Sequence, residues 1–318
     1  MSESFEDRRF IVPGGLRGQS LERVLEHWLR DVRRPALRRL LREGVVRLNG
    51  IEADGRRKVE ADDVLELGIE TEELPRRARR AEGRPPVLYE DQACLVIGKP
   101  ASLASVPDRH GEPSVHGRLA EWFGAEDLRF VHRLDKGTSG VLLLAKGSAA
   151  ARSLEQQFRE RKIEKRYLAL VHGHPPTDEF RCDTPIGRTI RGGKVKLGEA
   201  KGAREARTDF LVRRRFRGYA LLDARPRTGR MHQIRAHLMC ISLPLAVDPL
   251  YGGASALFLS GFKRGYRAKR EERPLIDRLT LHAQRMAFTT PDGGTRVEVE
   301  ADCPKDLRVT LAKLERYA

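Results

Sequence analysis

A proline- and arginine-rich segment divides this sequence of 318 residues into two parts. Residues 72–86, EELPRRARRAEGRPP, contain three prolines and five arginines, and one leucine is their largest aliphatic residue. Such a segment has too little apolar surface to offset the entropy that folding costs. We therefore expect a flexible, basic linker at 72–86, a small domain at 1–71 and a large domain at 87–318.

The chain is strongly basic, with 61 Lys and Arg residues against 45 Asp and Glu residues and a formal net charge of +16 at pH 7. This excess favours a polyanionic partner, and nucleic acid is the leading candidate. The sequence contains no apolar run of about 18 residues and no signal-peptide core. We therefore expect nucleic acid as a partner, no membrane association, and a cytoplasmic protein that acts as a monomer.

The sequence lacks the motifs of nucleotide cofactors and of metal sites. It has no G-x-x-x-x-G-K-[ST] segment, and no strand-like run leads into G-x-G-x-x-G. Its four cysteines lie far apart, without the spacing of zinc ligands. His232 and His237 are five residues apart, whereas helical zinc pairs are four apart. We therefore expect neither a cofactor nor a metal.

Residues 20–43 have the apolar spacing of two short amphipathic helices. Ser20 is a suitable N-cap, Pro35 marks a break, and Gly44 ends the second helix. Short apolar runs separated by turns follow, with Asn49–Gly50 as the first turn, and these runs predict short strands. The small domain is therefore predicted to be a helix–helix–hairpin unit.

The second of these helices and the turn after it are basic, through Arg38, Arg39, Arg42 and Arg47. A solvated helix face is one interpretation of this pattern. However, residues 20–68, with LRRLLREGVVRLNGIEADGRRKVEADDVLEL, resemble the small RNA-binding domain shared with the fourth protein of the small ribosomal subunit, called here the S-four-like domain. The resemblance implies an α/β domain whose four arginines contact structured RNA.

From residue 87 onward the sequence indicates an α+β domain. Apolar runs predict strands at 95–97, 141–145, 167–171, 209–215, 220–224, 286–289 and 296–299, and helices at 149–161, 231–240 and 307–317. Several of the strands are joined by short turns. A mixed, mainly antiparallel sheet flanked by helices therefore fits better than a doubly wound parallel sheet.

The segment FVHRLDKGTSGVLLLAK, residues 130–146, places charged residues directly before an apolar strand-like run. Arg133 and Asp135 point to the same side of an extended or turning chain, and Leu134 points away. Amides and hydroxyls of residues 136–140 can hold the carboxylate in place, ready to act as a nucleophile or a base. From these residues alone, a structural ion pair between Arg133 and Asp135 is an equal alternative.

Two further segments are rich in basic residues. In ARPRTGRMHQIRAHLM, residues 224–239, a helix is predicted after Gly229, with His232 and Arg235 on one face. Together with Arg230 this helix start suits a phosphate or a carboxylate, and we expect Arg230 and His232 to contact RNA. The strand EKRYLALV carries Tyr167, which is either a core residue or part of a surface that faces nucleic acid.

These segments, with LYEDQACLVIGKPA, DTPIGR, PLAVDPLYGG and LHAQRMAF, resemble the RluA-type pseudouridine synthases, in the same order over residues 87–302. The resemblance implies the fold of that catalytic domain and an RNA pseudouridine synthase, an isomerase that needs no cofactor. It also implies that Asp135 is the essential catalytic residue, that Tyr167 and Arg235 act beside it, and that Arg133 displaces the target base.

The chain departs from the family pattern at Gly98 and Ser102, where Asn and Gly are usual, so we expect a different local turn. The basic run at 261–273 is expected to form a loop particular to this chain. The expected substrate is large-subunit ribosomal RNA. Transfer RNA as the substrate and RNA binding without catalysis are the alternatives, whereas a methyltransferase would require a glycine-rich loop that the sequence lacks.

Overall fold

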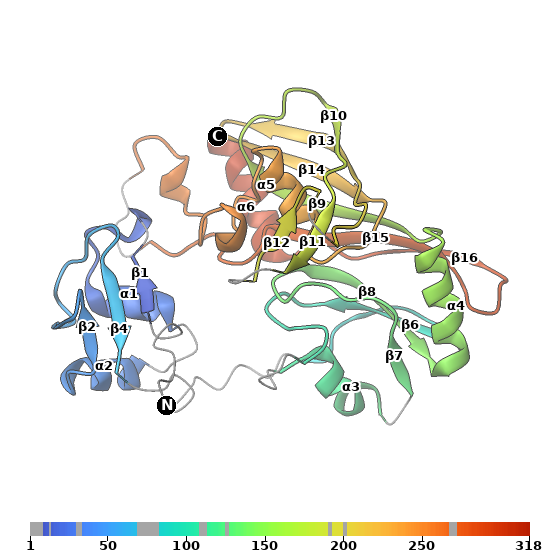
Figure 1. The fold of residues 1–318 in the computed structure, drawn as a ribbon, viewed down its shortest axis with the longest axis horizontal. Coiled ribbons are helices and arrows are strands. Elements are labelled where there is room, and N and C mark those ends of the chain that lie inside the picture. Colours follow the sequence, from blue (N-terminus) through green and yellow to red (C-terminus); the bar gives the residue numbers. More distant parts are fainter. Residues whose placement is uncertain are drawn as a thin grey trace. The chain divides into compact units, whose positions relative to one another are not determined.

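The computed structural model describes residues 9–12, 14–29, 34–68, 83–107, 113–124, 127–189, 193–199, 202–266 and 272–318. The chain divides into two compact units, Met1–Gly83 and Arg84–Ala318 (Figure 1). Most of the linker predicted at 72–86 and the middle of the basic run predicted at 261–273 lie outside the described residues. Within the described segments, no helix is both long and apolar enough to cross a membrane.

The first unit contains two helices and a four-stranded antiparallel sheet of order β1-β4-β2-β3. Its elements are β1 (Arg9–Ile11), the 3-10 helix η2 (Gly14–Leu16), α1 (Leu21–Trp28), α2 (Arg34–Arg42), β2 (Val46–Leu48), β3 (Ile51–Glu52) and β4 (Val64–Leu67). Both predicted helices are present, and the predicted Asn49–Gly50 turn joins β2 to β3. Pro35 lies in the first turn of α2 and not at a break, because a first turn does not need the missing N–H.

The second unit is built on a large mixed sheet of order β10-β13-β14-β9-β15-β8-β6-β5, to which β16 is added beside β15 and β7 beside β8. The strands are β5 (Val87–Glu90), β6 (Cys94–Lys99), β7 (Leu128–Phe130), β8 (Ser139–Lys146), β9 (Glu164–His172), β10 (Glu179–Cys182), β13 (Thr208–Phe216), β14 (Tyr219–Pro226), β15 (Leu281–Thr289) and β16 (Arg296–Glu300). Apart from the parallel pair β8–β15, the described strand pairs of this sheet are antiparallel. The predicted mixed, mainly antiparallel sheet is therefore confirmed.

Helices cover both faces of this sheet. They are α3 (Val115–Phe123), α4 (Gly147–Arg159), α5 (Gln233–Cys240) and α6 (Lys305–Tyr317), with short 3-10 helices η4 (Pro249–Tyr251) and η5 (Leu259–Gly261) and a separate hairpin of β11 (Ile186–Thr189) and β12 (Val195–Leu197). Ile234 of α5 packs in one apolar cluster with Ala169, and Leu307 of α6 packs in another with Leu170. Because successive strand residues point to opposite faces, α5 and α6 lie on opposite sides of β9.

A glycine allows the parallel contact between β8 and β15. Gly140 lies opposite Ala283, with a φ of 116°, and a Cβ atom there would collide with the backbone carbonyl of Ala283. Only glycine avoids this collision, so the glycine of the TSG segment has a packing role. The contact sets the start of β8 and therefore the position of the loop at residues 131–138 that precedes it.

Candidate active site

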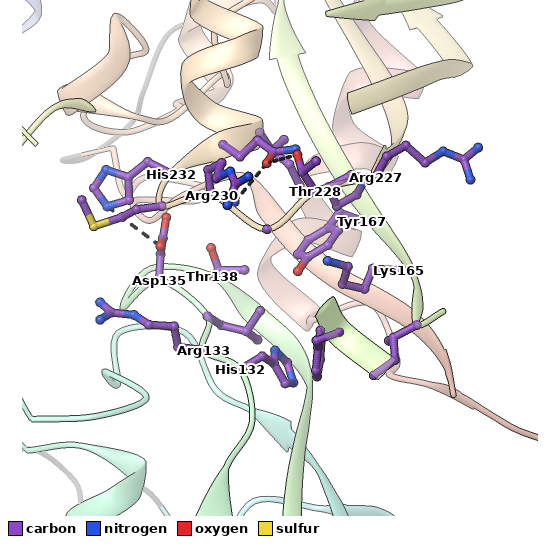
Figure 2. A pocket seen from close by; sticks show the side chains of 18 of the residues that line it. His132, Arg133, Asp135, Thr138, Lys165, Tyr167, Arg227, Thr228, Arg230 and His232 are labelled. Atoms are coloured by element: carbon purple, nitrogen blue, oxygen red, sulfur yellow. Dashed lines mark hydrogen bonds and ion pairs between the residues drawn. The ribbon is translucent and has the colours of Figure 1, made fainter. Parts of the chain in front are cut away.

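A cavity of about 600 Å³ lies beside the loop that precedes β8 (Figure 2). Three segments and Leu281 of β15 line it: the segments are the loop at 131–138, the first residues of β9 with the end of α4, and the chain from the end of β14 into α5. The predicted residues Arg133, Asp135, Tyr167, Arg230, His232 and Arg235 are all among the lining residues. The structure therefore brings together residues that are up to a hundred positions apart in the sequence.

Asp135 forms an ion pair with Arg235. Nη1 of Arg235 donates a hydrogen bond of 2.9 Å to Oδ2 of Asp135, and Nε2 of His232 lies 3.9 Å from Oδ1. In Figure 2 the Asp135 carboxylate points toward His232, while the side chain of Arg133 extends in another direction. Arg133 is exposed, and with the described residues it forms no hydrogen bond or ion pair. The structural alternative, an Arg133–Asp135 ion pair, is therefore absent.

The alternating pattern of the HRLD segment explains how the loop is held. Nε2 of His132 accepts a 2.9 Å hydrogen bond from the backbone N–H of Leu143 in β8. Burial, and then the charge of Lys165, lower the pKa of His132 to about 3, so its ring stays neutral and can accept this bond. Leu134 is buried, and both its N–H and its carbonyl are bonded to the hydroxyl of Ser105. His132 and Leu134 anchor the loop, and Asp135 lies at the cavity.

Arg235 is held in turn by a second carboxylate. Its Nε and Nη2 donate to the two carboxylate oxygens of Asp248, at 2.7 and 2.9 Å, and the Asp248 side chain is 0% exposed. Burial lowers the pKa of Arg235, but hydrogen bonding to Asp248 and the charges of Asp248 and Asp135 outweigh it, so the net pKa is raised. A planar guanidinium that binds one carboxylate through two donors has a fixed orientation. Asp248 therefore orients Arg235 so that Nη1 donates to Asp135.

The loop that carries Asp248 is itself closely packed. Asp248 caps η4 by accepting the N–H of Tyr251, and the Tyr251 hydroxyl contacts Nδ1 of His232 at 3.1 Å. A Cβ atom at Gly253 would collide with the carbonyl of Leu245, so the last glycine of PLAVDPLYGG is needed for this packing. The sequence segment was recognised, but the contacts of Asp248 and Tyr251 with Arg235 and His232 were not predicted.

The start of α5 differs from the prediction. The helix begins at Gln233, and His232 is its N-cap, with a φ of 53°. The prediction that His232 and Arg235 share one face of the helix is therefore wrong, because His232 precedes the helix. Both residues nevertheless approach Asp135. Burial lowers the pKa of His232, with the charge of Asp135 acting against it. Arg230 lies in the turn before the helix, where its Nε donates to the carbonyl of Glu205.

Tyr167 and Lys165 project from the first half of β9. Both line the cavity, and they lie close together in Figure 2. Burial, and then the charge of Asp135, raise the pKa of Tyr167 above its ordinary value, which keeps the phenol protonated. Thr138 also lines the cavity, and its buried hydroxyl has no hydrogen-bond partner among the described residues. Lys165 and Thr138 were not predicted as site residues.

His237 does not share a site with His232. Its two ring nitrogens contact the hydroxyl of Thr208 and the carbonyl of Thr184, each at 2.9 Å. In the part of the chain that is described, no group of His, Cys, Asp and Glu side chains has the arrangement of a metal site. His232 contacts the Tyr251 hydroxyl and lines the active-site cavity, whereas His237 is bonded to Thr208 and Thr184.

The four basic residues predicted for RNA binding in the first unit differ in their contacts. Arg38 pairs with Glu22 and Arg39 with Glu43, at 2.7 and 2.6 Å. Arg42 bonds only to the backbone carbonyl of Arg38, and neither Arg42 nor Arg47 has a carboxylate partner among the described residues. Arg38, Arg39 and Arg42 lie on α2, the predicted second helix, and Arg47 lies on strand β2 that follows it.

Of the predicted residues, a carboxylate, three arginines, a histidine and a tyrosine line a cavity large enough for a nucleotide. Comparison with known proteins identifies the class to which such a site belongs. A family profile described as RNA pseudouridylate synthase matches residues 93–239. Human RNA pseudouridylate synthase domain containing 4 has a solved structure with a TM-score of 0.56 and 25% identity, covering 72% of this chain and 92% of that chain.

Similarity to curated proteins extends over nearly the whole chain. An uncharacterized RNA pseudouridine synthase of Mycobacterium bovis is 34% identical over 96% of this chain and 97% of its own length. Ribosomal large subunit pseudouridine synthase C of Escherichia coli is 33% identical, over 93% of each chain. The protein of that name in Vibrio cholerae is 30% identical over 99% of this chain and 100% of its own. The chain therefore belongs to the RluA-type family of RNA pseudouridine synthases, which are isomerases.

Proposed function

We propose that this enzyme converts specific uridines of large-subunit ribosomal RNA to pseudouridine, with Asp135 as the essential catalytic residue. The observation that carries this proposal is the Asp135–Arg235 ion pair at a cavity of about 600 Å³. The choice of RNA is supported by relatives that are named ribosomal large subunit pseudouridine synthase C and are 30–33% identical. The positive charge of the chain is compatible with that substrate.

The reaction breaks the bond between the ribose and the uracil nitrogen, turns the base, and joins it again through a ring carbon. A uridine stacked in RNA is out of reach of Asp135, so the nucleotide must leave the stack and enter the cavity. Arg133 is exposed at the cavity and free of carboxylate partners among the described residues. Its planar guanidinium can stack and form hydrogen bonds in the space that the base leaves.

Within the cavity, Asp135 either attacks the ribose or the base, or accepts a proton during formation of a glycal-like intermediate. Arg235 orients the carboxylate for either step, because its own orientation is determined by Asp248. Tyr167 packs against the base, and its protonated hydroxyl is available for proton transfer. Because the overall reaction is an isomerisation, we propose that these side chains supply the groups that it requires.

Deleting the gene should remove one or more pseudouridines from large-subunit ribosomal RNA and leave other RNAs unchanged. Pseudouridine mapping across all cellular RNAs, with and without the gene, is the measurement. Restoring the wild-type gene should restore the lost sites, whereas a gene that encodes Asp135→Asn should not. If pseudouridines were lost from transfer RNA alone, transfer RNA would be the substrate in place of ribosomal RNA. If none were lost, the result would argue for RNA binding without catalysis.

The first unit is proposed to be an S-four-like domain that contributes affinity for structured RNA. Replacing Arg38 and Arg42 together by Gln should weaken RNA binding and lower its salt dependence, because binding with fewer phosphate contacts releases fewer counterions. The rate at saturating RNA should stay near that of the wild-type enzyme. Arg17→Gln in the same unit is the control, since it removes an exposed arginine paired with a glutamate, as Arg38 is, but outside α2. Equal binding by the double variant and this control over a range of salt concentrations would contradict the assignment.

A further inference from the structure

A second cavity, of about 480 Å³, adjoins the active-site cavity. The two cavities share Arg161, Ile163, Lys165, Pro226 and Arg227 among their lining residues. These residues belong to the end of α4, the start of β9 and the end of β14. A ligand in the active-site cavity can therefore extend into the second cavity past this shared wall.

Basic side chains outnumber acidic ones around the second cavity, but most of them have carboxylate partners. Arg161 pairs with Glu205 at 3.0 Å, and Arg227 pairs with Asp209 at 2.6 Å. These exposed pairs neutralise part of the positive charge within the protein itself. Such exposed pairs contribute little to stability. Among the described residues, only some of the cations around the second cavity lack a carboxylate partner.

Lys165 and Arg225 are two such cations. Among the described residues neither has a carboxylate partner, and the contact found for the Lys165 ammonium is the face of the Phe158 ring, 5.7 Å away. Burial lowers the pKa of Lys165 to about 8, as expected for a cation that lacks a counter-charge. Nε of Arg225 is buried without a hydrogen-bond acceptor among the described residues. A buried donor without an acceptor is costly, which points to an acceptor that a ligand supplies.

The two residues lie on neighbouring strands. Strand β14 runs antiparallel to β9 with Ala224 opposite Tyr167, so Arg225 lies opposite Arg166, one position from Lys165 and facing the other side of the strand pair. Lys165 lines both cavities and Arg225 lines the second. Figure 2 shows Lys165 beside Tyr167 on the wall of the active-site cavity. Lys165 therefore belongs to the wall that the two cavities share, whereas Arg225 belongs to the second cavity alone.

We propose that Lys165 and Arg225 each bind a phosphodiester group of the RNA strand that flanks the target uridine. This inference rests on the proposed function, because a nucleotide held in the active-site cavity stays joined to its strand, and the strand must leave through an opening in the wall. A phosphodiester is the anion that RNA offers there. It accepts hydrogen bonds from a guanidinium and pairs with an ammonium as a point charge.

Binding of a short fluorescein-labelled oligouridine tests this subsite. Fluorescence anisotropy between about 50 and 200 mM KCl gives the slope of log affinity against log salt. Lys165→Gln and Arg225→Gln should each reduce that slope by about 0.7, the value for one phosphate contact on a single strand. Lys165→Arg should keep the wild-type slope, because it retains the charge. The control is Arg308→Gln, which removes an exposed charge from α6 outside both cavities.

The outcomes separate this subsite from the proposed reaction. Wild-type slopes in both Lys165→Gln and Arg225→Gln, or an equal reduction in Arg308→Gln, would overturn the subsite. Release of tritium from RNA labelled at the uracil 5-position, measured with the wild-type enzyme, tests the reaction independently. Reduced slopes without tritium release would mean that the proposed reaction is wrong and the phosphate subsite correct. If Lys165→Gln does not fold, Arg225→Gln and Lys165→Arg still decide the question.

Discussion

Replacing Asp135 by asparagine is expected to lower turnover by at least about a thousandfold, because the variant keeps the shape of the side chain but loses the charged oxygen that would act on the nucleotide. The amide of the variant can still accept a hydrogen bond from Arg235, so the cavity should keep its form. RNA affinity should change little, since phosphate contacts provide most of the binding energy. The expected result is therefore a stable protein that binds RNA and does not convert it.

The measurement is tritium release from uracil-labelled RNA under single-turnover conditions, with affinity measured separately by anisotropy. Asp302→Asn, a change at an exposed carboxylate outside the cavity, is the matched control and should turn over as the wild type does. Turnover by Asp135→Ala at the wild-type rate would remove Asp135 from the reaction. Loss of RNA binding in step with loss of turnover would instead assign Asp135 to binding.

Seven of the ten described strands of the large sheet were predictable because their apolar residues recur in runs or in alternation. All seven strands predicted for the large domain are present, and the helices predicted at 149–161 and 307–317 correspond to α4 and α6. The HRLD segment was predictable for a local reason, since alternation along an extended chain puts Leu134 on the buried side. Elements decided by local pattern were therefore accessible from the sequence alone.

Features that depend on contacts between distant segments were not accessible in this way. The short strands β5, β7 and β10 gain their partners from the sheet, and α3 was missed although Val115, Leu119 and Trp122 have helical spacing and are buried. No local sequence pattern indicates that Asp248 accepts two hydrogen bonds from Arg235. In the same way, no local pattern indicates that the Lys165 ammonium lies over the Phe158 ring of α4.

Ser102 illustrates how a departure from the family pattern is accommodated. The substitution of Ser for the usual Gly led to the expectation of a different turn. In the structure Ser102 adopts a φ of 69°, a left-handed conformation that glycine adopts with less strain. The nearby Lys99 is buried and donates to the carbonyls of Pro100 and Leu103 at 2.8 and 2.7 Å, which ties the turn together. We infer that these bonds offset the strain at Ser102.

The contact between Asp248 and Arg235 leads to the second large expected effect. Asp248→Ala should lower the free energy of unfolding by about 3–5 kcal/mol, because it leaves the buried Arg235 without its main partner. It should also lower the turnover of the folded fraction, since Arg235 would no longer have a fixed orientation toward Asp135. Urea denaturation measures the first effect, and single-turnover tritium release below the unfolding transition measures the second.

Asp223 offers a control that separates stability from positioning. It is buried to a similar degree and accepts a 2.7 Å hydrogen bond from Arg213, but it does not line the active-site cavity. Asp223→Ala should cost less free energy of unfolding, because Arg213 is 38% exposed and water can solvate it, and the folded enzyme should keep its turnover. If Asp248→Ala behaves in the same way, Asp248 serves stability alone. If only Asp248→Ala loses turnover, the second carboxylate is what holds Arg235 in position for Asp135.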